Sequence, residues 1–213
     1  MQFKIDLKIF IFIIIFYLTK QIQIYSIIML FATIRELGHL VMGIVLGFKP
    51  RKIELMPLGL SIAFKVDSKY YNQKIKNGTL LSFKRLIVAI AGPVTNFILA
   101  IIFCNLNIIN ELKEQIIYSN LLIGLFNLIP IYPMDGGRIV KEIVHIFKGF
   151  RKSTILTNEI SNISIVIITA FSSIGIYYLK NIGILFILVY LWAIVLIENK
   201  KYRIKRRVLN LIN

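Results

Sequence analysis

The sequence contains few of the residues that keep soluble proteins in water or cross-link them. Its 213 residues include 10 acidic residues, one cysteine and five prolines. A single cysteine excludes a disulfide within one chain, so the fold has no covalent cross-link. Because 26 lysines and arginines accompany so few acidic residues, the formal net charge is +16. This excess of positive charge needs either an acidic partner or another physical reason.

Apolar residues are abundant: 57% of the chain is hydrophobic and the mean hydropathy is +0.77. A soluble domain of this size would not be so apolar. We predict an all-α polytopic membrane protein with about six transmembrane helices. The expected spans lie near 8–19, 24–48, 86–106, 116–134, 161–179 and 182–198. Together, residues 1–213 should form one membrane-embedded domain, with a core over 24–150, C-terminal helices over 161–198 and a basic tail over 199–213.

The basic residues are distributed unevenly between the expected spans. The N-terminus, the loops 49–85 and 135–160, and the C-terminal tail hold 22 of the 26 lysines and arginines. Cytoplasmic loops of membrane proteins carry such an excess, so the pattern predicts an integral, multi-pass protein with both termini in the cytoplasm. The charge therefore requires no nucleic acid as a partner. The basic tail is also expected to contact anionic lipid of the bilayer.

Two shorter segments have their own pattern. The stretch from Ile53 to Phe64 mixes β-forming residues with Pro57 and Gly59, which predicts a short, re-entrant, β-hairpin-like segment after the second span. Residues 139–150 have the apolar spacing of a short amphipathic helix. We expect Gly149 to end that helix.

The run Arg35-Glu36-Leu37-Gly38-His39 lies within the second expected span. It matches the zinc-protease motif H-E-x-x-H except that arginine replaces the first histidine. An ionisable residue inside a membrane span costs roughly 2.5–3.5 kcal/mol on insertion scales, so three of them indicate a functional site. The plainer alternative is an arginine that reaches toward the membrane surface beside a glutamate and a histidine that only pack between helices.

Two further motifs carry polar groups at membrane depth. In the run from Asn127 to Arg138, Asp135 is an oxygen donor suited to a metal, and Gly136-Gly137 allows close backbone approach. The run Ala91-Gly92-Pro93-Val94-Thr95-Asn96-Phe97 combines a close-packing Gly-Pro pair with a buried amide.

Together, these three motifs resemble the site-2 protease family of intramembrane zinc metalloproteases, and among them the stage IV sporulation protein FB branch. The resemblance covers roughly residues 24 to 150. It implies that Glu36 is catalytic, that His39 and Asp135 bind zinc, and that Asn96 and Asn127 bind substrate. It further implies cleavage of a membrane-associated protein near the cytoplasmic face, such as a sporulation pro-sigma factor, and regulatory membrane partners.

Arg35 departs from the family pattern at the third ligand position. A guanidinium has no lone pair for a metal, whereas a catalytic zinc has three protein ligands and water. His145 lies ten residues beyond Asp135, roughly 15 Å along a helix, which is too far to replace the missing ligand. If the arginine takes the place of the metal, as in an inactive pseudoprotease, Arg35 is expected to pair with Asp135 or with Glu36.

Two accounts of Arg35 stay open. In one, the chain is a catalytically inactive pseudoprotease that binds membrane substrates or partner proteins. In the other, arginine was introduced into an active enzyme or is a sequence error, since one base change converts a histidine codon to an arginine codon. A transporter or channel would also use charge within the membrane, but the ordered set of three motifs argues against that function.

Overall fold

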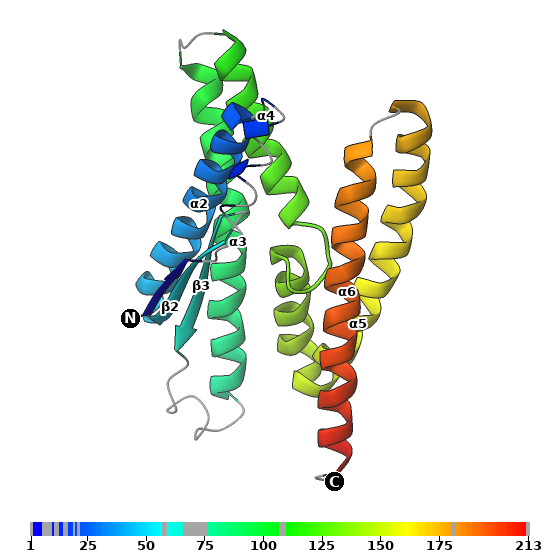
Figure 1. Ribbon diagram of the computed structural model, residues 1–213. Helices are drawn as coiled ribbons and strands as arrows, with labels where there is room; N and C mark the ends of the chain where they lie inside the picture. Colours follow the sequence, from blue (N-terminus) through cyan, green and yellow to red (C-terminus); the bar gives the residue numbers. More distant parts are fainter. Residues whose placement is uncertain are drawn as a thin grey trace. The chain divides into compact units, whose positions relative to one another are not determined.

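The computed structural model describes residues 2–5, 10, 13–14, 17–18, 20, 22–56, 59–65, 76–106, 110–179 and 182–211. Most of the expected first span and most of the polar segment between residues 65 and 77 lie outside the described residues. The chain divides into two compact units, residues 1–127 and 128–213, and each is described by itself (Figure 1).

The first unit is built from three long helices and a small sheet. Its elements are β1 (Gln2–Ile5), α2 (Ile22–Val45), β2 (Lys49–Met56), β3 (Gly59–Lys65), α3 (Lys76–Asn105) and α4 (Asn110–Asn127). The second expected span corresponds to α2 and the third to the later part of α3. In the fourth expected span, the helix ends at Asn127, ahead of the two prolines, because proline cannot continue a helical hydrogen-bond ladder.

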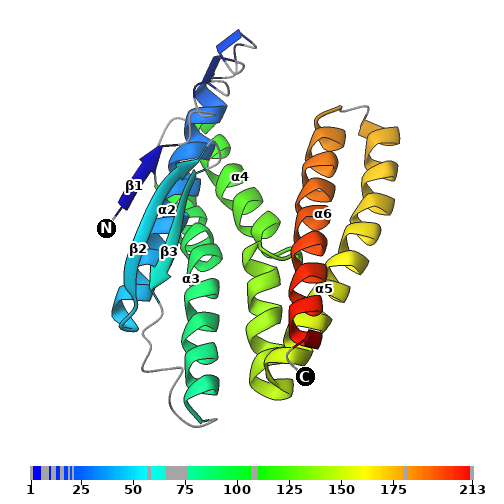
Figure 2. The ribbon, with the colours of Figure 1, turned by 60° about the horizontal axis from the view of Figure 1, so that its bottom comes forward.

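The expected hairpin is present as β2 and β3, which pair antiparallel in a sheet of order β1-β2-β3. The hairpin lies against α2 (Figure 2). At that contact, a side chain on Gly43 would collide with the ring of Phe64, which also packs against Phe48 at 5.8 Å between ring centroids. The parallel pairing of β1 with β2 is an addition to the predicted all-α class, although the protein is predominantly helical.

The core of the first unit is apolar and lies where α2, α3 and α4 meet. Ile27 and Phe31 of α2 are buried against Ile116 of α4, and Phe103 of α3 meets Phe31 edge-on at 5.7 Å between centroids. The C-terminus of α2 is closed by a cation from α3, because Lys84 donates to the Leu46 carbonyl at 3.0 Å. A positive charge there complements the helix dipole.

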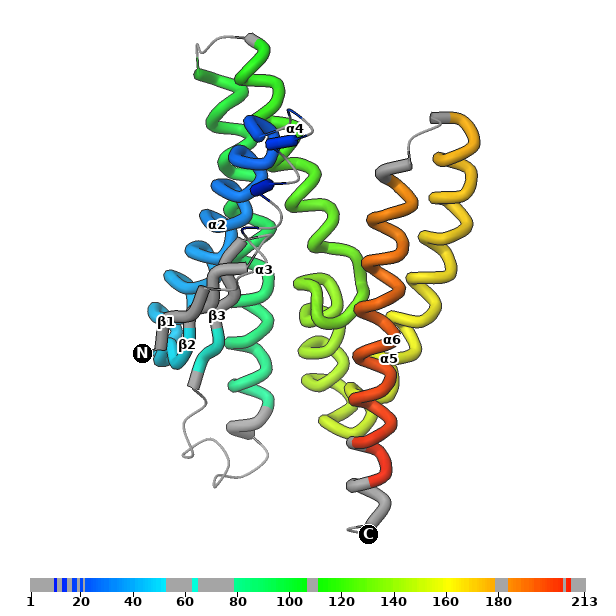
Figure 3. Tube along the Cα trace, viewed as in Figure 1, coloured from blue at the N-terminus to red at the C-terminus, as the bar shows by residue number. Residues whose placement is uncertain are grey.

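The second unit consists of a loop over residues 128–134, α5 (Asp135–Leu179) and α6 (Ile182–Leu211) (Figure 3). Gly149 interrupts α5 with φ of 77°, a left-handed conformation that ends the first helical part as predicted. The two parts fold back on each other, since Ser153 donates to the Lys141 carbonyl at 2.6 Å. The predicted loop over 135–160 is therefore helical apart from this break, and α6 continues as helix through most of the expected tail.

Three helices of the described residues are long and apolar enough to cross a membrane: Ile22–Val45, Thr79–Asn105 and the region Asp135–Tyr178 that holds the expected span 161–179. They support an integral membrane protein. The count of six spans, the re-entrant position of the hairpin and the cytoplasmic termini remain predictions.

The loop over residues 128–134 wraps closely around the start of α5. A side chain on Gly137 would come within 2.3 Å of the Tyr132 amide nitrogen, whereas one on Gly175 would meet Ile184 at an ordinary 3.6 Å. We expect Gly137→Ala to lower the free energy of unfolding by about 1–3 kcal/mol through overpacking. Gly175→Ala, the control in the same helix, should be neutral or slightly stabilising. Thermal unfolding in detergent micelles checks this, and equal midpoints for the two variants would contradict it.

Candidate functional site

The three ionisable residues of the motif lie on the buried side of α2. Glu36 and His39 are three residues apart, and Arg35 is four residues before His39, so the three share one face of the helix. His39 is 3% exposed and Glu36 is 8% exposed, although neighbouring positions such as Leu37 and Val41 are exposed. Charged and titratable groups are thus turned inward while apolar groups face outward, which is the arrangement of a functional helix in lipid.

Arg35 and Glu36 form an ion pair. The Nη2 atom of Arg35 donates to Oε1 of Glu36 at 2.5 Å, and the two side chains are only 12% and 10% exposed. This is the second of the two pairings expected from the sequence. Removing one partner of such a shielded pair would leave an uncompensated charge, at a cost of roughly 3–5 kcal/mol. The guanidinium therefore engages the carboxylate to which the family resemblance assigns catalysis.

His39 is oriented by α3. Its Nδ1 atom lies 2.7 Å from the Val88 carbonyl oxygen, which can only accept a hydrogen bond, so Nδ1 carries the proton. This kind of second contact fixes the tautomer of metal-binding histidines and leaves the lone pair on Nε2. A side chain on Gly92 would come within 2.1 Å of Nε2, so only glycine allows the ring to lie here.

The helices α2 and α3 approach closely at the site for the same steric reason. A side chain on Gly38 would come within 2.2 Å of Thr95 Oγ1. The glycine of the α2 motif therefore packs directly onto the 91–97 motif of α3. Small residues at such contacts bring helix backbones together in membranes. The close approach holds His39 against the middle of α3.

The two predicted substrate-binding asparagines differ in their surroundings. Asn96 on α3 is fully buried, and neither polar atom of its amide has a hydrogen-bond partner among the described residues. Asn127 is half-buried at the end of α4 and donates to the Ile123 carbonyl of its own helix at 2.8 Å. Buried amides normally have partners, so Asn96 has hydrogen-bonding capacity available for a ligand. Asn127 instead uses an N–H of its amide for a hydrogen bond within its own helix.

Asp135 opens α5 in the second unit. It is 3% exposed, and Arg138 Nη1 lies 3.8 Å from one carboxylate oxygen. A carboxylate in the first turn is stabilised by the helix dipole. Asp135 belongs to a different unit from Glu36 and His39, so its approach to them, or to Arg35, remains a prediction.

The donor set for a metal is limited. Among the residues that the structure describes, no group of three histidine, cysteine, aspartate or glutamate side chains converges. His145, the only other histidine, lies on the first part of α5 with Nδ1 3.7 Å from Glu142 Oε2. Since that part of the helix is continuous from Asp135, His145 lies about 15 Å along its axis, as the sequence predicted.

One contributor to the site and one further buried amide were not foreseen. The Val88 carbonyl that orients His39 belongs to the backbone, so no side-chain pattern could indicate it. Asn120 of α4 is fully buried, and its Oδ1 atom has no partner within the described part of the chain. An asparagine in an apolar helix was the one available signal for this residue.

Comparison with known proteins supports the same relationship. A model of the peptidase family M50 matches residues 105–172. A zinc metalloprotease of Methanocaldococcus jannaschii is 33% identical over 176 residues, covering 78% of this chain and 46% of that protein. Stage IV sporulation protein FB of Bacillus subtilis is 26% identical over 127 residues, covering 58% of this chain and 41% of that protein. The chain thus spans less than half the length of these two relatives.

The fold has a counterpart among solved structures. It resembles the site-2 protease from Methanocaldococcus jannaschii with a TM-score of 0.66 and 24% identity, over 93% of this chain and 91% of that one. The resemblance expected from the three motifs is therefore confirmed at the level of family and fold.

The orientation of His39 can be tested directly. We expect ¹⁵N NMR of the histidine-labelled protein in micelles to show a protonated Nδ1 and an unprotonated Nε2 for His39, because the Val88 carbonyl accepts from Nδ1. A His145→Gln variant assigns the signals, since the chain has two histidines. Gly92→Ala should change the His39 signals, and Gly175→Ala should not. A ring protonated at Nε2 alone would contradict the orientation.

Proposed function

The chain is a relative of the site-2 proteases, and from this relationship we propose that it acts as an intramembrane metalloendopeptidase of that type. Its substrate would be a membrane-associated protein that is cleaved near the cytoplasmic face. A sporulation pro-sigma factor is the substrate that the resemblance to stage IV sporulation protein FB suggests. The proposal rests most on one observation: Glu36 and His39 are both buried on α2, and α3 holds the His39 ring.

The roles that we propose follow from the chemistry of each side chain. Glu36 would move protons at the scissile bond, and His39 and Asp135 would hold zinc, which supplies an activated water when bound. Asn96 would bind the substrate backbone, because its amide has both a donor and an acceptor and no partner among the described residues. Asn127 would contribute at the end of α4.

The substrate must present an extended backbone, because the carbonyls of a helix are already hydrogen-bonded. Among the described strands, β3 pairs on one side only, with β2. An unwound substrate segment could add to the other edge of β3 through backbone hydrogen bonds. The position of the hairpin against α2, the helix that carries Glu36 and His39, supports this role.

Zinc fits these residues only in part. His39 has the tautomer of a ligand and Asp135 is a suitable oxygen donor, but position 35 provides a cation instead of a third ligand. Two protein ligands do not make a catalytic zinc site. The residues of this sequence therefore do not fit the metal while arginine occupies position 35.

The ion pair of Arg35 with Glu36 favours a second candidate function. A carboxylate engaged by a guanidinium is not free to serve as a general base. In this candidate, the chain binds membrane substrates or partner proteins without cleaving them, and the arginine satisfies the buried carboxylate in the absence of a metal. Regulatory membrane partners would then be its targets.

A cleavage assay separates the two candidates. The protein is reconstituted in vesicles with a panel of single-span reporter proteins that carry a fluorescent cytoplasmic domain. We expect the Arg35→His variant to release the fluorescent domain, because histidine restores the third ligand and frees Glu36. Adding Glu36→Gln to that variant should lower the rate at least 100-fold, because it removes the general base.

The same assay with the unmodified protein then distinguishes the two candidate functions. Release that is lost in the Glu36→Gln variant supports the active metalloendopeptidase. Release only after Arg35→His supports the inactive binder. If Arg35→His neither binds zinc nor cleaves any reporter, the zinc ligands proposed here and the metalloendopeptidase candidate are wrong.

A further inference from the structure

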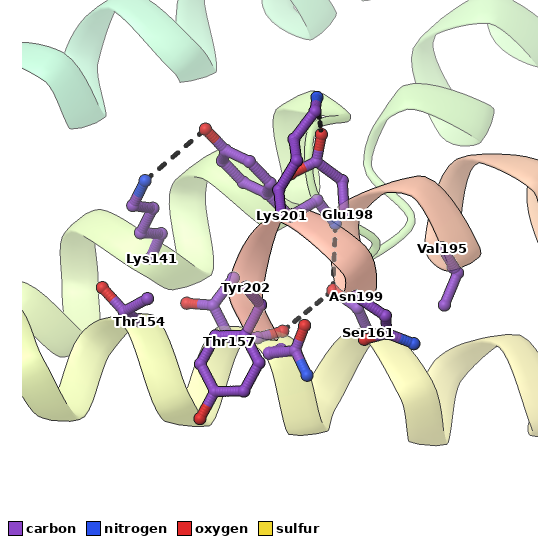
Figure 4. Close-up of a pocket in the computed structure, with 11 residues that line it drawn as sticks. Lys141, Thr154, Thr157, Ser161, Val195, Glu198, Asn199, Lys201 and Tyr202 are labelled. Atoms are coloured by element: carbon purple, nitrogen blue, oxygen red, sulfur yellow. Dashed lines mark hydrogen bonds and ion pairs between the residues drawn. The ribbon is translucent and has the colours of Figure 1, made fainter. Parts of the chain in front are cut away.

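The second unit contains a pocket, lined mainly by residues with polar side chains, between the two parts of α5 and the end of α6 (Figure 4). Its volume is about 160 Å³, which is room for several water molecules or for a small polar head group. All of its lining residues belong to residues 128–213. None of them is among the residues that the family resemblance assigns to the protease site.

Two lysines from different helices line the pocket. Lys141 of α5 lies over the ring of Tyr132, with Nζ 4.5 Å from the ring centroid and 3.5 Å from the hydroxyl oxygen. Lys201 of α6 donates to Glu198 Oε1 at 2.5 Å. The hydrogen bond and the charge of Glu198 raise the pKa of Lys201, so its ammonium stays protonated at neutral pH. With one carboxylate and two ammonium groups, the lining carries a net positive charge.

A buried hydroxyl in the lining has no partner. Thr157 is 4% exposed, and its Oγ1 atom makes no hydrogen bond within the described part of the chain. The neighbouring Ser161 is fully used, because its hydroxyl accepts from the Tyr132 amide at 3.0 Å and donates to the Thr157 carbonyl at 2.8 Å. Leaving a hydroxyl unpaired in this setting costs roughly 1–3 kcal/mol, so an oxygen-rich ligand in the pocket would recover that loss.

The pocket lies where two apolar helices become polar. Residues 160–179 of α5 and 182–197 of α6 contain no charged residue in the described ranges, and the lining begins at Ser161 and Val195. Asn199 donates to Asn162 at 2.8 Å and joins the helices at this level. Beyond it, α6 carries the basic residues Lys200, Lys201, Arg203, Lys205, Arg206 and Arg207. In a bilayer, this level is that of the lipid head groups.

We propose that this pocket is a phosphate-binding site, filled by the head-group phosphate of an anionic phospholipid. Lys141 and Lys201 supply the positive charge, and the hydroxyls of Tyr132 and Thr157 supply hydrogen bonds to phosphate oxygens. Basic pockets between membrane helices on the cytoplasmic side bind such head groups. A soluble phosphate compound has the same chemistry and is distinguished by experiment.

The test measures lipid retained by the whole protein. Native mass spectrometry from micelles compares added phosphatidylglycerol with phosphatidylcholine. We expect one phosphatidylglycerol to bind about tenfold more tightly than phosphatidylcholine. Lys141→Gln with Lys201→Gln should abolish that preference. The control pair, Lys148→Gln with Lys152→Gln, removes the same charge from α5 residues that do not line the pocket and should keep it.

Thr157→Val provides the sharper variant. It replaces the unpaired hydroxyl by a methyl group of similar size. If Thr157 has only a structural role, the variant protein should be as stable as the original or more stable, and its lipid binding should not change. If the hydroxyl binds phosphate, we expect phosphatidylglycerol affinity to fall three- to tenfold while the thermal midpoint of the lipid-free protein is kept.

Competition identifies the source of the phosphate. Phosphatidylglycerol that stays bound in millimolar inorganic phosphate supports the lipid head group. Retention of inorganic phosphate itself, lost in the double lysine variant, supports the same site with a soluble ligand. Equal binding of both lipids together with no phosphate binding, or an unchanged preference in the double lysine variant, would overturn the proposal.

Discussion

The helix α2 must carry an arginine, a glutamate and a histidine through an apolar region, and the first unit is built around this constraint. Arg35 and Glu36 satisfy each other as an ion pair, and His39 donates to the Val88 carbonyl of α3. The His39 contact requires α2 and α3 to approach closely, which the glycines at 38 and 92 allow. Without its partner, either charge of the ion pair would cost several kcal/mol.

The same constraint explains the tension between fold and chemistry. The M50 segment and the relatives place the chain in a family of zinc metalloproteases, and a solved site-2 protease shares its fold. The arginine at position 35 pairs with Glu36 and so neutralises the charge of a buried carboxylate. Catalysis would need the same carboxylate. The ion pair stabilises the buried face of α2, but a general base would need the same Glu36 carboxylate without a cation bound to it.

Much of the fold could be predicted because its signals are local. The apolar runs, the β-forming residues around Pro57 and Gly59, and the glycine at 149 each act through their own backbone or side chain, and the structure contains the corresponding helices, hairpin and break. The pairing of β1 with β2 was missed because the partners lie about 50 residues apart. Likewise, α6 continues past Glu198 because lysine and arginine are good helix formers, although their charge indicated a tail.

The site was predictable to the extent that it resides in side chains on one helix face. Glu36, His39 and Asn96 are buried as their motifs indicated, whereas the Val88 carbonyl has no signature in the sequence. The polar pocket of the second unit was not predictable either. It forms only because α5 folds back at Gly149 and brings Lys141 and Thr157, 16 residues apart, to the same cavity.

We propose that His39 and Asp135 are two ligands of a zinc site that lacks its third ligand because residue 35 is arginine. Zinc per chain, measured by elemental mass spectrometry on purified protein, tests it most directly. The account predicts about one zinc per chain in the Arg35→His variant, and loss of that zinc when either His39→Ala or Asp135→Ala is added. Zinc that persists in Arg35→His without His39 or without Asp135, or an Arg35→His variant that binds none, would contradict it.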